Sequence, residues 1–243
     1  MALSIQQIPR RLPRSDTGPV HVFHHIPKCG GTSLRQILAG WFRLKLDYRE
    51  GWSDQYPEKK DLSALTSRHC LCGHFELEGE RLWQRYPEVF IDEHYRVFTF
   101  LREPLQARMS LYRYERRHGG SLDLSLEEAL FRGRNSFARI LQATAEDYRQ
   151  VLDRYWFIGI VEEMETSVKQ LAAWLDKPFE AVPHVNRTTE SGAAPDAGPV
   201  SDEVVARFRE ANRLDYLIYE YARERLHQAC MAGSQTGLQE APG

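Results

Sequence analysis

The feature that most constrains the fold is a strand pattern followed by a glycine-containing loop and a helix pattern, at residues 20–41. Residues 20–26 (VHVFHHI) form a β-branched and aromatic run that ends at Pro27, which indicates a buried strand. After Thr32, four apolar residues recur at spacings that place them on one face of a helix: Leu34, Ile37, Leu38 and Trp41. This stretch is therefore predicted to form a strand, a glycine loop and a helix.

The same alternation recurs along the chain. Residues 95–101 (YRVFTFL) predict a second strong strand, after which Pro104 opens a helix predicted to end near Arg117. Shorter strands are predicted at residues 69–75 and 156–161. Further helices are predicted at residues 126–132, where Ser125 and Glu128 form a capping box, and at 136–154, 168–175 and 201–221. Because parallel strands need crossover connections, this order predicts an α/β protein with a P-loop-like three-layer fold, in which helices flank a central parallel sheet.

We expect a single domain over residues 19–230, between a flexible leader at 1–18 and a disordered tail at 231–243. Four cysteines are too few and too unevenly placed for a disulfide framework, which predicts reduced thiols. The sequence shows neither a signal peptide nor an apolar run of the roughly 20 residues that a membrane span requires, so we expect a cytoplasmic protein. A net charge of −2 argues against a general nucleic-acid binder, and any anion site must be local.

The first loop, residues 27–33 (PKCGGTS), has the chemistry of a phosphate-binding loop. Gly30 and Gly31 allow successive backbone N–H groups to converge on an anion at the positive end of the helix dipole. Thr32 and Ser33 supply hydroxyl donors, and Lys28 supplies a point charge. The loop is not a Walker A motif, because its lysine precedes the glycines, and this argues against magnesium-dependent triphosphate chemistry. The alternative is a tight turn with a solvated lysine.

The second loop follows the strand at residues 95–101. Arg102 lies directly after this strand and Ser110 eight residues later, so both could bind a second phosphate. Alternatively, Arg102 pairs with Glu103 or Glu115. The remaining arginines of this segment are expected to form a solvated helix face: Arg108, Arg113, Arg116 and Arg117.

These two loops, in this order, resemble the sulfotransferases that use 3′-phosphoadenosine 5′-phosphosulfate (PAPS), and most closely their carbohydrate branch, which includes heparan sulfate 2-O-sulfotransferase. PKCGGTS resembles the family's 5′-phosphosulfate loop, with Cys29 in place of the usual threonine, and RVFTFLREPLQARMSLYRY resembles its 3′-phosphate segment. Four later segments also resemble family segments, in the family's order: CGHFELEG, FIGIVEEMETSVKQL, PHVNRTTES and NRLDYLIYEYARERL. The resemblance covers most of residues 20–227.

The resemblance implies a sulfotransferase domain that moves a sulfuryl group from PAPS to an acceptor hydroxyl, on a carbohydrate, and releases 3′-phosphoadenosine 5′-phosphate (PAP) without needing a metal. His74 would be the general base, since imidazole accepts a proton near neutral pH, and Lys28 would stabilise the leaving phosphate. The implied cofactor-binding residues are Lys28, Cys29, Gly30, Gly31, Thr32, Ser33, Arg102, Ser110, Arg187, Thr188 and Thr189.

Three other interpretations remain open. A P-loop nucleotide kinase shares the strand, loop and helix, and a catalytically silent protein could keep the anion loops and only bind a nucleotide. A zinc site is suggested by the cluster His69, Cys70, Cys72 and His74, although the spacing is poor for a tetrahedral ion.

Some residues near these motifs are given no chemical role. His24 and His25 are interpreted as structural, and Glu162 and Glu163 could orient Lys28 or cap a helix. Trp52 and Trp83 could form a sugar platform or belong to the core. The acceptor and the oligomeric state cannot be predicted from the sequence.

Overall fold

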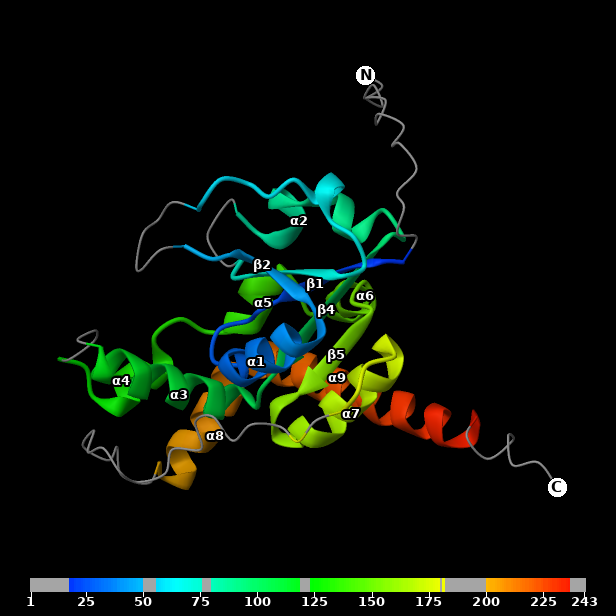
Figure 1. Ribbon diagram of the computed structural model, residues 1–243. Coiled ribbons are helices and arrows are strands. Elements are labelled where there is room, and N and C mark those ends of the chain that lie inside the picture. Colours follow the sequence, from blue (N-terminus) through cyan, green and yellow to red (C-terminus); the bar gives the residue numbers. More distant parts are fainter. Residues whose placement is uncertain are drawn as a thin grey trace, which may run out of the picture.

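A computed structural model describes residues 18–49, 56–75, 80–118, 123–179, 181 and 200–236, with side chains described as far as Ala232. Its centre is a five-stranded, fully parallel sheet with the order β2-β3-β1-β4-β5 and helices packed around it (Figure 1). The strands are β1 (Val20–His24), β2 (Arg43–Asp47), β3 (His69–Gly73), β4 (Tyr95–Leu101) and β5 (Phe157–Ile160). The predicted α/β class with a central parallel sheet is confirmed.

The helices within the described residues are α1 (Gly31–Trp41), α2 (Leu82–Arg85), α3 (Pro104–Arg117), α4 (Leu126–Phe131), α5 (Ser136–Leu141), α6 (Tyr148–Asp153), α7 (Met164–Leu175), α8 (Asp202–Ala211) and α9 (Arg213–Thr236). Short 3₁₀ turns lie at Leu62–Ala64, Pro87–Phe90 and Val161–Glu163. Pro104 opens α3, and Ser125 and Glu128 form a capping box at α4, both as predicted. Among these helices, none is both long and apolar enough to span a bilayer.

Several elements differ from the prediction. The helix predicted at 136–154 is two helices, because Gln142 adopts a left-handed conformation (φ 53°) and ends α5. The helix predicted at 201–221 breaks at Asn212, between α8 and α9. Helix α9 continues past Tyr221 to Thr236. Strand β2 was not predicted at all.

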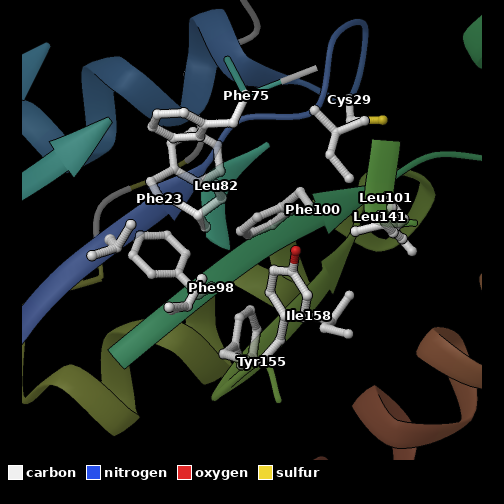
Figure 2. Packing of buried hydrophobic residues seen from close by; sticks show 14 of the residues in the cluster. Phe23, Cys29, Phe75, Leu82, Phe98, Phe100, Leu101, Leu141, Tyr155 and Ile158 are labelled. Atoms are coloured by element: carbon white, nitrogen blue, oxygen red, sulfur yellow. The ribbon is translucent and has the colours of Figure 1, made fainter. Parts of the chain in front are cut away.

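Alternate residues of β1 point to opposite faces of the sheet, and both faces are covered. On one face the His21 ring lies 5.0 Å from the Phe42 ring at the end of α1. On the other face, His24 Nδ1 is hydrogen-bonded to the hydroxyl of Tyr155, with 2.8 Å between the two atoms. Tyr155 follows α6. The core between these layers is rich in aromatic rings, including the stacked pair Phe23 and Phe98 with centroids 5.2 Å apart (Figure 2).

The junction of α8 and α9 is fixed to the start of α5. The buried carboxylate of Asp215 accepts hydrogen bonds from the backbone N–H groups of Phe137 (3.1 Å) and Ala138 (2.9 Å). Burial raises the pKa of Asp215 to about 6. The Asn212 side chain accepts a bond from the Asn135 N–H (2.9 Å). These contacts tie the C-terminal helices to the middle of the chain.

Candidate functional site

Three predicted site groups meet at one edge of the sheet. Strand β1 lies between β3 and β4 and is parallel to both, so the carboxyl ends of all three strands lie at the same edge. The loop with Lys28 follows β1, His74 follows β3, and Arg102 follows β4. Open α/β sheets bind ligands at this edge.

The first loop has the backbone shape of an anion cradle. Lys28 (φ 65°) and Gly30 (φ 77°) are both left-handed, and the Cys29 N–H donates to the Ile26 carbonyl at 3.3 Å. For a residue with a side chain, such as Lys28, this conformation costs roughly 1 kcal/mol or more. Helix α1 starts directly afterwards, with the Leu34 N–H bonded to the Gly30 carbonyl at 3.1 Å, so the N–H groups of its first turn point out of the helix.

The hydroxyl residues and the cysteine of this loop differ in exposure. Thr32 is exposed, whereas Ser33 is 8% exposed. Cys29 is 1% exposed, and its side chain lies among the core residues shown in Figure 2. Burial raises the pKa of the Cys29 thiol, which keeps it neutral. The Cys29 side chain therefore packs into the core, and only its backbone is available to the loop.

The predicted base belongs to a cluster of three rings, His25, Tyr48 and His74, which we call the histidine cluster. His74 Nε2 lies 2.9 Å from His25 Nδ1, although the two residues are 49 positions apart. The Tyr48 hydroxyl lies 3.0 Å from the same His25 nitrogen. The Tyr56 hydroxyl donates to the His74 carbonyl. His25, interpreted as structural from the sequence, is thus in direct contact with the predicted base.

Both histidines of this cluster are neutral at pH 7. Burial, and then the nearby charges of Arg49, Arg35 and Lys28, lower the pKa of His74 to about 4. Burial, followed by His74 and Arg35, holds the pKa of His25 well below its usual value. An imidazole that stays neutral keeps a lone pair for accepting a proton.

Gly31 makes room for the His25 ring. A Cβ atom added at Gly31 would lie 1.6 Å from His25 Nε2, which is far inside van der Waals contact. The His25 ring is also stacked on Phe23, with centroids 5.5 Å apart. The imidazole of His25 therefore lies between the first turn of α1 and the His74 ring.

A buried ion pair fixes the strand end that carries His74. Arg85 donates to both carboxylate oxygens of Asp47, from Nε at 2.8 Å and from Nη2 at 3.1 Å, and the Tyr86 hydroxyl donates at 2.7 Å. Asp47 is completely buried at the end of β2. A Cβ at Gly73 would lie 2.4 Å from the Asp47 carbonyl oxygen, so β2 and β3 approach closely just before His74.

On the other side of the loop, Arg102 is held by acidic groups. Glu162 Oε1 lies 3.9 Å from Arg102 Nε and accepts from the Glu103 N–H at 3.0 Å. Two tyrosines of α9 donate to these carboxylates, Tyr219 to Glu162 (3.0 Å) and Tyr216 to Glu103 (2.6 Å). We call these five residues the Arg102 cluster.

The buried Nε of Arg102 makes no hydrogen bond within the described part of the chain. It therefore remains a donor for an anionic ligand. Glu162 contacts Arg102 rather than Lys28, and Glu163 binds Arg223 (2.6 Å) and His227 (2.7 Å). Among the described residues, Arg102 forms its ion pair with Glu162 and not with Glu103 or Glu115, the two partners that the alternative interpretation predicted.

Ser110 lies on the face of α3 that is directed toward the loop. It precedes Tyr114 by four residues and Arg117 by seven, so the three share one helix face. The Lys28 ammonium lies over the Tyr114 ring, 4.1 Å from its centroid. Burial, followed by the charges of Arg117 and Arg102, lowers the pKa of Lys28. Cations from both loops thus gather around Lys28.

Several predictions fall outside this arrangement. Arg187, Thr188, Thr189 and Trp52 lie outside the described residues. Trp83 is 45% exposed and donates to the Gln142 side chain at 2.9 Å.

For the zinc interpretation, the described residues contain no group of three or more His, Cys, Asp or Glu side chains placed to hold a metal ion. Cys70 and Cys72 are buried with their sulfurs 3.8 Å apart, and burial raises the pKa of Cys70 well above its usual value. His69 bonds within its own turn, where its Nδ1 accepts from the Thr66 N–H at 3.1 Å.

A cavity of about 920 Å³ lies away from these groups, between α4 and α8. It is lined by Ser125, Glu127, Glu128, Phe131, Arg134, Arg207, Glu210 and Ala211. None of the predicted site residues lines it. The chemistry-bearing residues instead gather at the carboxyl edge of the sheet.

No protein-family model matches the chain, and no curated protein sequence matches it. Two solved structures are similar to it. A sulfotransferase from Alicyclobacillus acidocaldarius is 15% identical with a TM-score of 0.48, over 86% of this chain and 96% of that one. The mouse sulfotransferase SULT7A1 complexed with PAP is 12% identical with a TM-score of 0.49, over 87% of this chain and 91% of that one. At these values, neither likeness assigns an activity or a residue role to this chain.

Proposed function

We propose that this protein is a PAPS-dependent sulfotransferase that transfers a sulfuryl group to a hydroxyl of a carbohydrate acceptor. One observation carries the proposal: His74 Nε2 lies 2.9 Å from His25 Nδ1, and His25 is only three residues before Lys28. This contact brings the predicted base to the start of the predicted phosphate loop. Several segments resemble the carbohydrate branch of the family, which includes heparan sulfate 2-O-sulfotransferase. This resemblance favours a sugar hydroxyl as the acceptor.

The residues at the sheet edge fit an anionic nucleotide. The left-handed backbone at Lys28 and Gly30 turns the first N–H groups of α1 toward one point, where they would hold the 5′-phosphate with Thr32 and Ser33. Arg102, whose buried Nε makes no hydrogen bond within the described residues, and Ser110 on the facing side of α3 would hold the 3′-phosphate. By resemblance, Arg187, Thr188 and Thr189 would bind the same phosphate.

PAPS supplies the activated sulfuryl group when it is bound. His74, which is neutral at pH 7, would accept the proton as the acceptor O–H bond breaks, and the freed oxygen would form a bond to sulfur. The electron pair of the breaking sulfur–oxygen bond would then go to the departing 5′-phosphate, beside Lys28. The Lys28 ammonium would stabilise that charge. The negative charge of a bound nucleotide near Arg49, Arg35 and Lys28 would raise the pKa of His74 toward its ordinary value and make it a stronger base.

Calorimetric titration with PAP in excess chelator, in parallel with ATP plus magnesium, tests the proposal. We expect PAP to bind tightly without metal and ATP to bind weakly. Preference for magnesium-ATP would instead support a nucleotide kinase, and binding of neither would refute a nucleotide site. PAP release from PAPS in the presence of glycan acceptors then separates an enzyme from a silent nucleotide-binding protein.

A further inference from the structure

A smaller cavity lies between α3 and α4, which are side by side in the fold (Figure 1). Its volume is about 180 Å³, and it is lined by Arg108, Leu111, Tyr112, Glu115, Ala129 and Arg132. Residues 108, 112 and 115 share one face of α3. Each of them precedes a residue of the face with Ser110, Tyr114 and Arg117 by two positions, which is more than half a turn of a helix. The cavity is therefore on the side of α3 that faces away from Lys28.

Arg108 brings a cation to this cavity and uses only part of its hydrogen-bonding capacity. Expected from the sequence to be solvated, it is partly buried. Its Nη2 donates to the carbonyl oxygens of Arg132 and Gly133 at the end of α4, and within the described residues it makes no other hydrogen bond. Its Nε and Nη1 therefore keep N–H donors for a ligand. Burial lowers the pKa of Arg108, and the opposing charges of Asp215 and Glu115 do not fully offset this, so an anion would stabilise the guanidinium.

Tyr112 and Glu115 contribute groups of opposite kinds. Tyr112 is only 9% exposed, yet its hydroxyl makes no hydrogen bond in the part of the chain that the structure describes. A buried tyrosine hydroxyl usually has a partner, so this one is available to a ligand. The Glu115 carboxylate forms no ion pair with another described residue, and an ionised carboxylate only accepts hydrogen bonds. A fitting ligand must therefore accept from Arg108 and Tyr112 and donate to Glu115.

We propose that this cavity binds a phosphate group that carries a proton, either inorganic phosphate or a small phosphate monoester. Its ionised oxygens accept from Arg108 and from the Tyr112 hydroxyl, and its P–O–H group donates to the Glu115 carboxylate. Sulfate has the same size and shape but carries no proton near neutral pH, so it can only repel Glu115. The site therefore selects phosphate over sulfate. The inference goes beyond the proposed function and does not rest on it.

The size of the cavity agrees with such a ligand. A volume of about 180 Å³ is about six times the roughly 30 Å³ that one water occupies in the liquid, which leaves room for a phosphate ion. Pockets for drug-sized ligands begin at about 300 Å³, so a nucleotide would not fit.

The chain offers two mild substitutions and a matched control. Tyr112→Phe removes only the hydroxyl and keeps the ring packed. Glu115→Gln replaces an acceptor by an amide of the same shape that can also donate to sulfate. Tyr221→Phe is the control, because the Tyr221 hydroxyl donates to Asp153 of α6. Arg108 is left in place for the binding measurements, because it also binds the end of α4.

The side-chain Nε–H signal of Arg108 in ¹⁵N-arginine-labelled full-length protein reports on the cavity, and it is identified by its loss in Arg108→Lys. Titrations with sodium phosphate and with sodium sulfate are made at neutral pH and constant ionic strength. We expect a saturable shift with phosphate and a Kd for sulfate at least about tenfold higher, because like charges repel. Lys28→Ala should leave the Kd for phosphate unchanged, because Lys28 lies on the other side of α3.

The variants then test the assigned contacts. We expect Tyr112→Phe to raise the Kd for phosphate about tenfold or more, as for the loss of a hydrogen bond to a charged group, and Tyr221→Phe to leave it unchanged. Glu115→Gln should give phosphate and sulfate nearly equal affinities. Absence of a saturable shift with phosphate, equal binding of the two anions by wild type, or an unchanged Kd in Tyr112→Phe would overturn the inference. Glycerol 3-phosphate distinguishes the two sources of the phosphate group: tighter binding than inorganic phosphate supports a monoester, and weaker binding supports the free ion.

Discussion

The two sides of the candidate site are built from different chemistry. In the histidine cluster, burial keeps His25 and His74 neutral, and the contacts are hydrogen bonds and ring packing. In the Arg102 cluster, a permanent positive charge is held near the carboxylate of Glu162, which is itself bonded to Tyr219 of α9. One side of the site is therefore built from neutral, hydrogen-bonded rings, whereas the other holds a fixed positive charge.

Replacing the predicted base should affect only one of the two sides, and it should have the largest effect. We expect His74→Ala to lower turnover by roughly 10²- to 10⁴-fold, because a general base contributes about that much, while PAP affinity stays close to wild type. Turnover with PAPS and calorimetric titration with PAP measure the two effects separately. Near-normal turnover would show that His74 is not the base.

The pH dependence of stability follows from the buried histidines. Burial lowers the pKa of His21 and His74 to about 4 and that of His24 to about 3, so below pH 6.5 the unfolded chain binds protons that the folded chain does not. Each of these histidines therefore costs about 1.4 kcal/mol of stability per pH unit as the pH falls from 6.5 toward its folded pKa. Asp215 acts in the opposite direction between pH 6 and 3.8, because its raised pKa makes the folded chain bind the extra proton.

These three histidines and His25, whose pKa burial also holds well below its usual value, outweigh the single carboxyl group. We expect the free energy of unfolding in urea to be at least about 3 kcal/mol lower at pH 5.5 than at pH 7.5, with further loss below that. Equal stability at the two pH values would mean that the histidines titrate normally in the folded protein.

Removing a cation from the site should weaken nucleotide binding. We expect Arg102→Ala and Lys28→Ala each to raise the Kd for PAP about ten- to a hundredfold, since a hydrogen bond to a charged group contributes about 1.5–3 kcal/mol. Arg43→Ala, at the exposed start of β2, is the matched control and should leave the Kd unchanged. A similar loss in all three variants would point to a general charge effect rather than to a site.

Gly31→Ala tests how the loop and the histidine cluster depend on one another. The new methyl group would overlap His25 Nε2, and we expect a loss of about 1–3 kcal/mol in the free energy of unfolding, together with a lower kcat. Gly40→Ala in the same helix is the control, because a Cβ there meets nothing within 4 Å. It should stabilise the protein by about 0.5–1 kcal/mol. Identical stabilities for the two variants would contradict the packing described here.

We expect the smallest effect on PAP binding from removing the hydrogen bond between Tyr219 and Glu162 in the Arg102 cluster. Tyr219→Phe removes the hydrogen bond to Glu162, and we expect about 1 kcal/mol less stability and a less than fivefold rise in the Kd for PAP. Tyr221 is also on α9, but its hydroxyl donates to Asp153 of α6, so Tyr221→Phe should leave the Kd for PAP unchanged. Equal effects of both substitutions on PAP binding would argue against a specific tether.

Local sequence signals predicted the elements that are buried and regular. The strand at residues 95–101 and the helix opened by Pro104 have the predicted bounds, because apolar periodicity and a first-turn proline are local signals. Strand β2 could not be predicted in this way, because it lies at the sheet edge with Arg43, Lys45 and Leu46 exposed. The break at Gln142 depends on a left-handed residue that is not glycine, so its sequence gives no warning.

In the candidate site, too, local motifs predicted some residues, whereas others depend on contacts between distant parts of the chain. Lys28, Ser33 and Arg102 were predicted from motifs and lie at the carboxyl edge of the sheet. The contact of His25 with His74 joins the ends of two strands, and it exists only because β3 pairs with β1. The position of His25 at a strand end, beside the loop, was the only available signal. The pairing of Glu162 with Arg102 likewise requires β5 to lie next to β4.

The tyrosines of α9 also bear on the order in which the chain is synthesised. All five strands leave the ribosome before α9 does, yet Tyr216 and Tyr219 of α9 hold the carboxylates beside Arg102. A nascent chain that has completed these strands but not residues 213–236 therefore lacks the two tyrosine contacts beside Arg102. We expect the Arg102 cluster to reach its final arrangement late in translation, after the sheet itself can form.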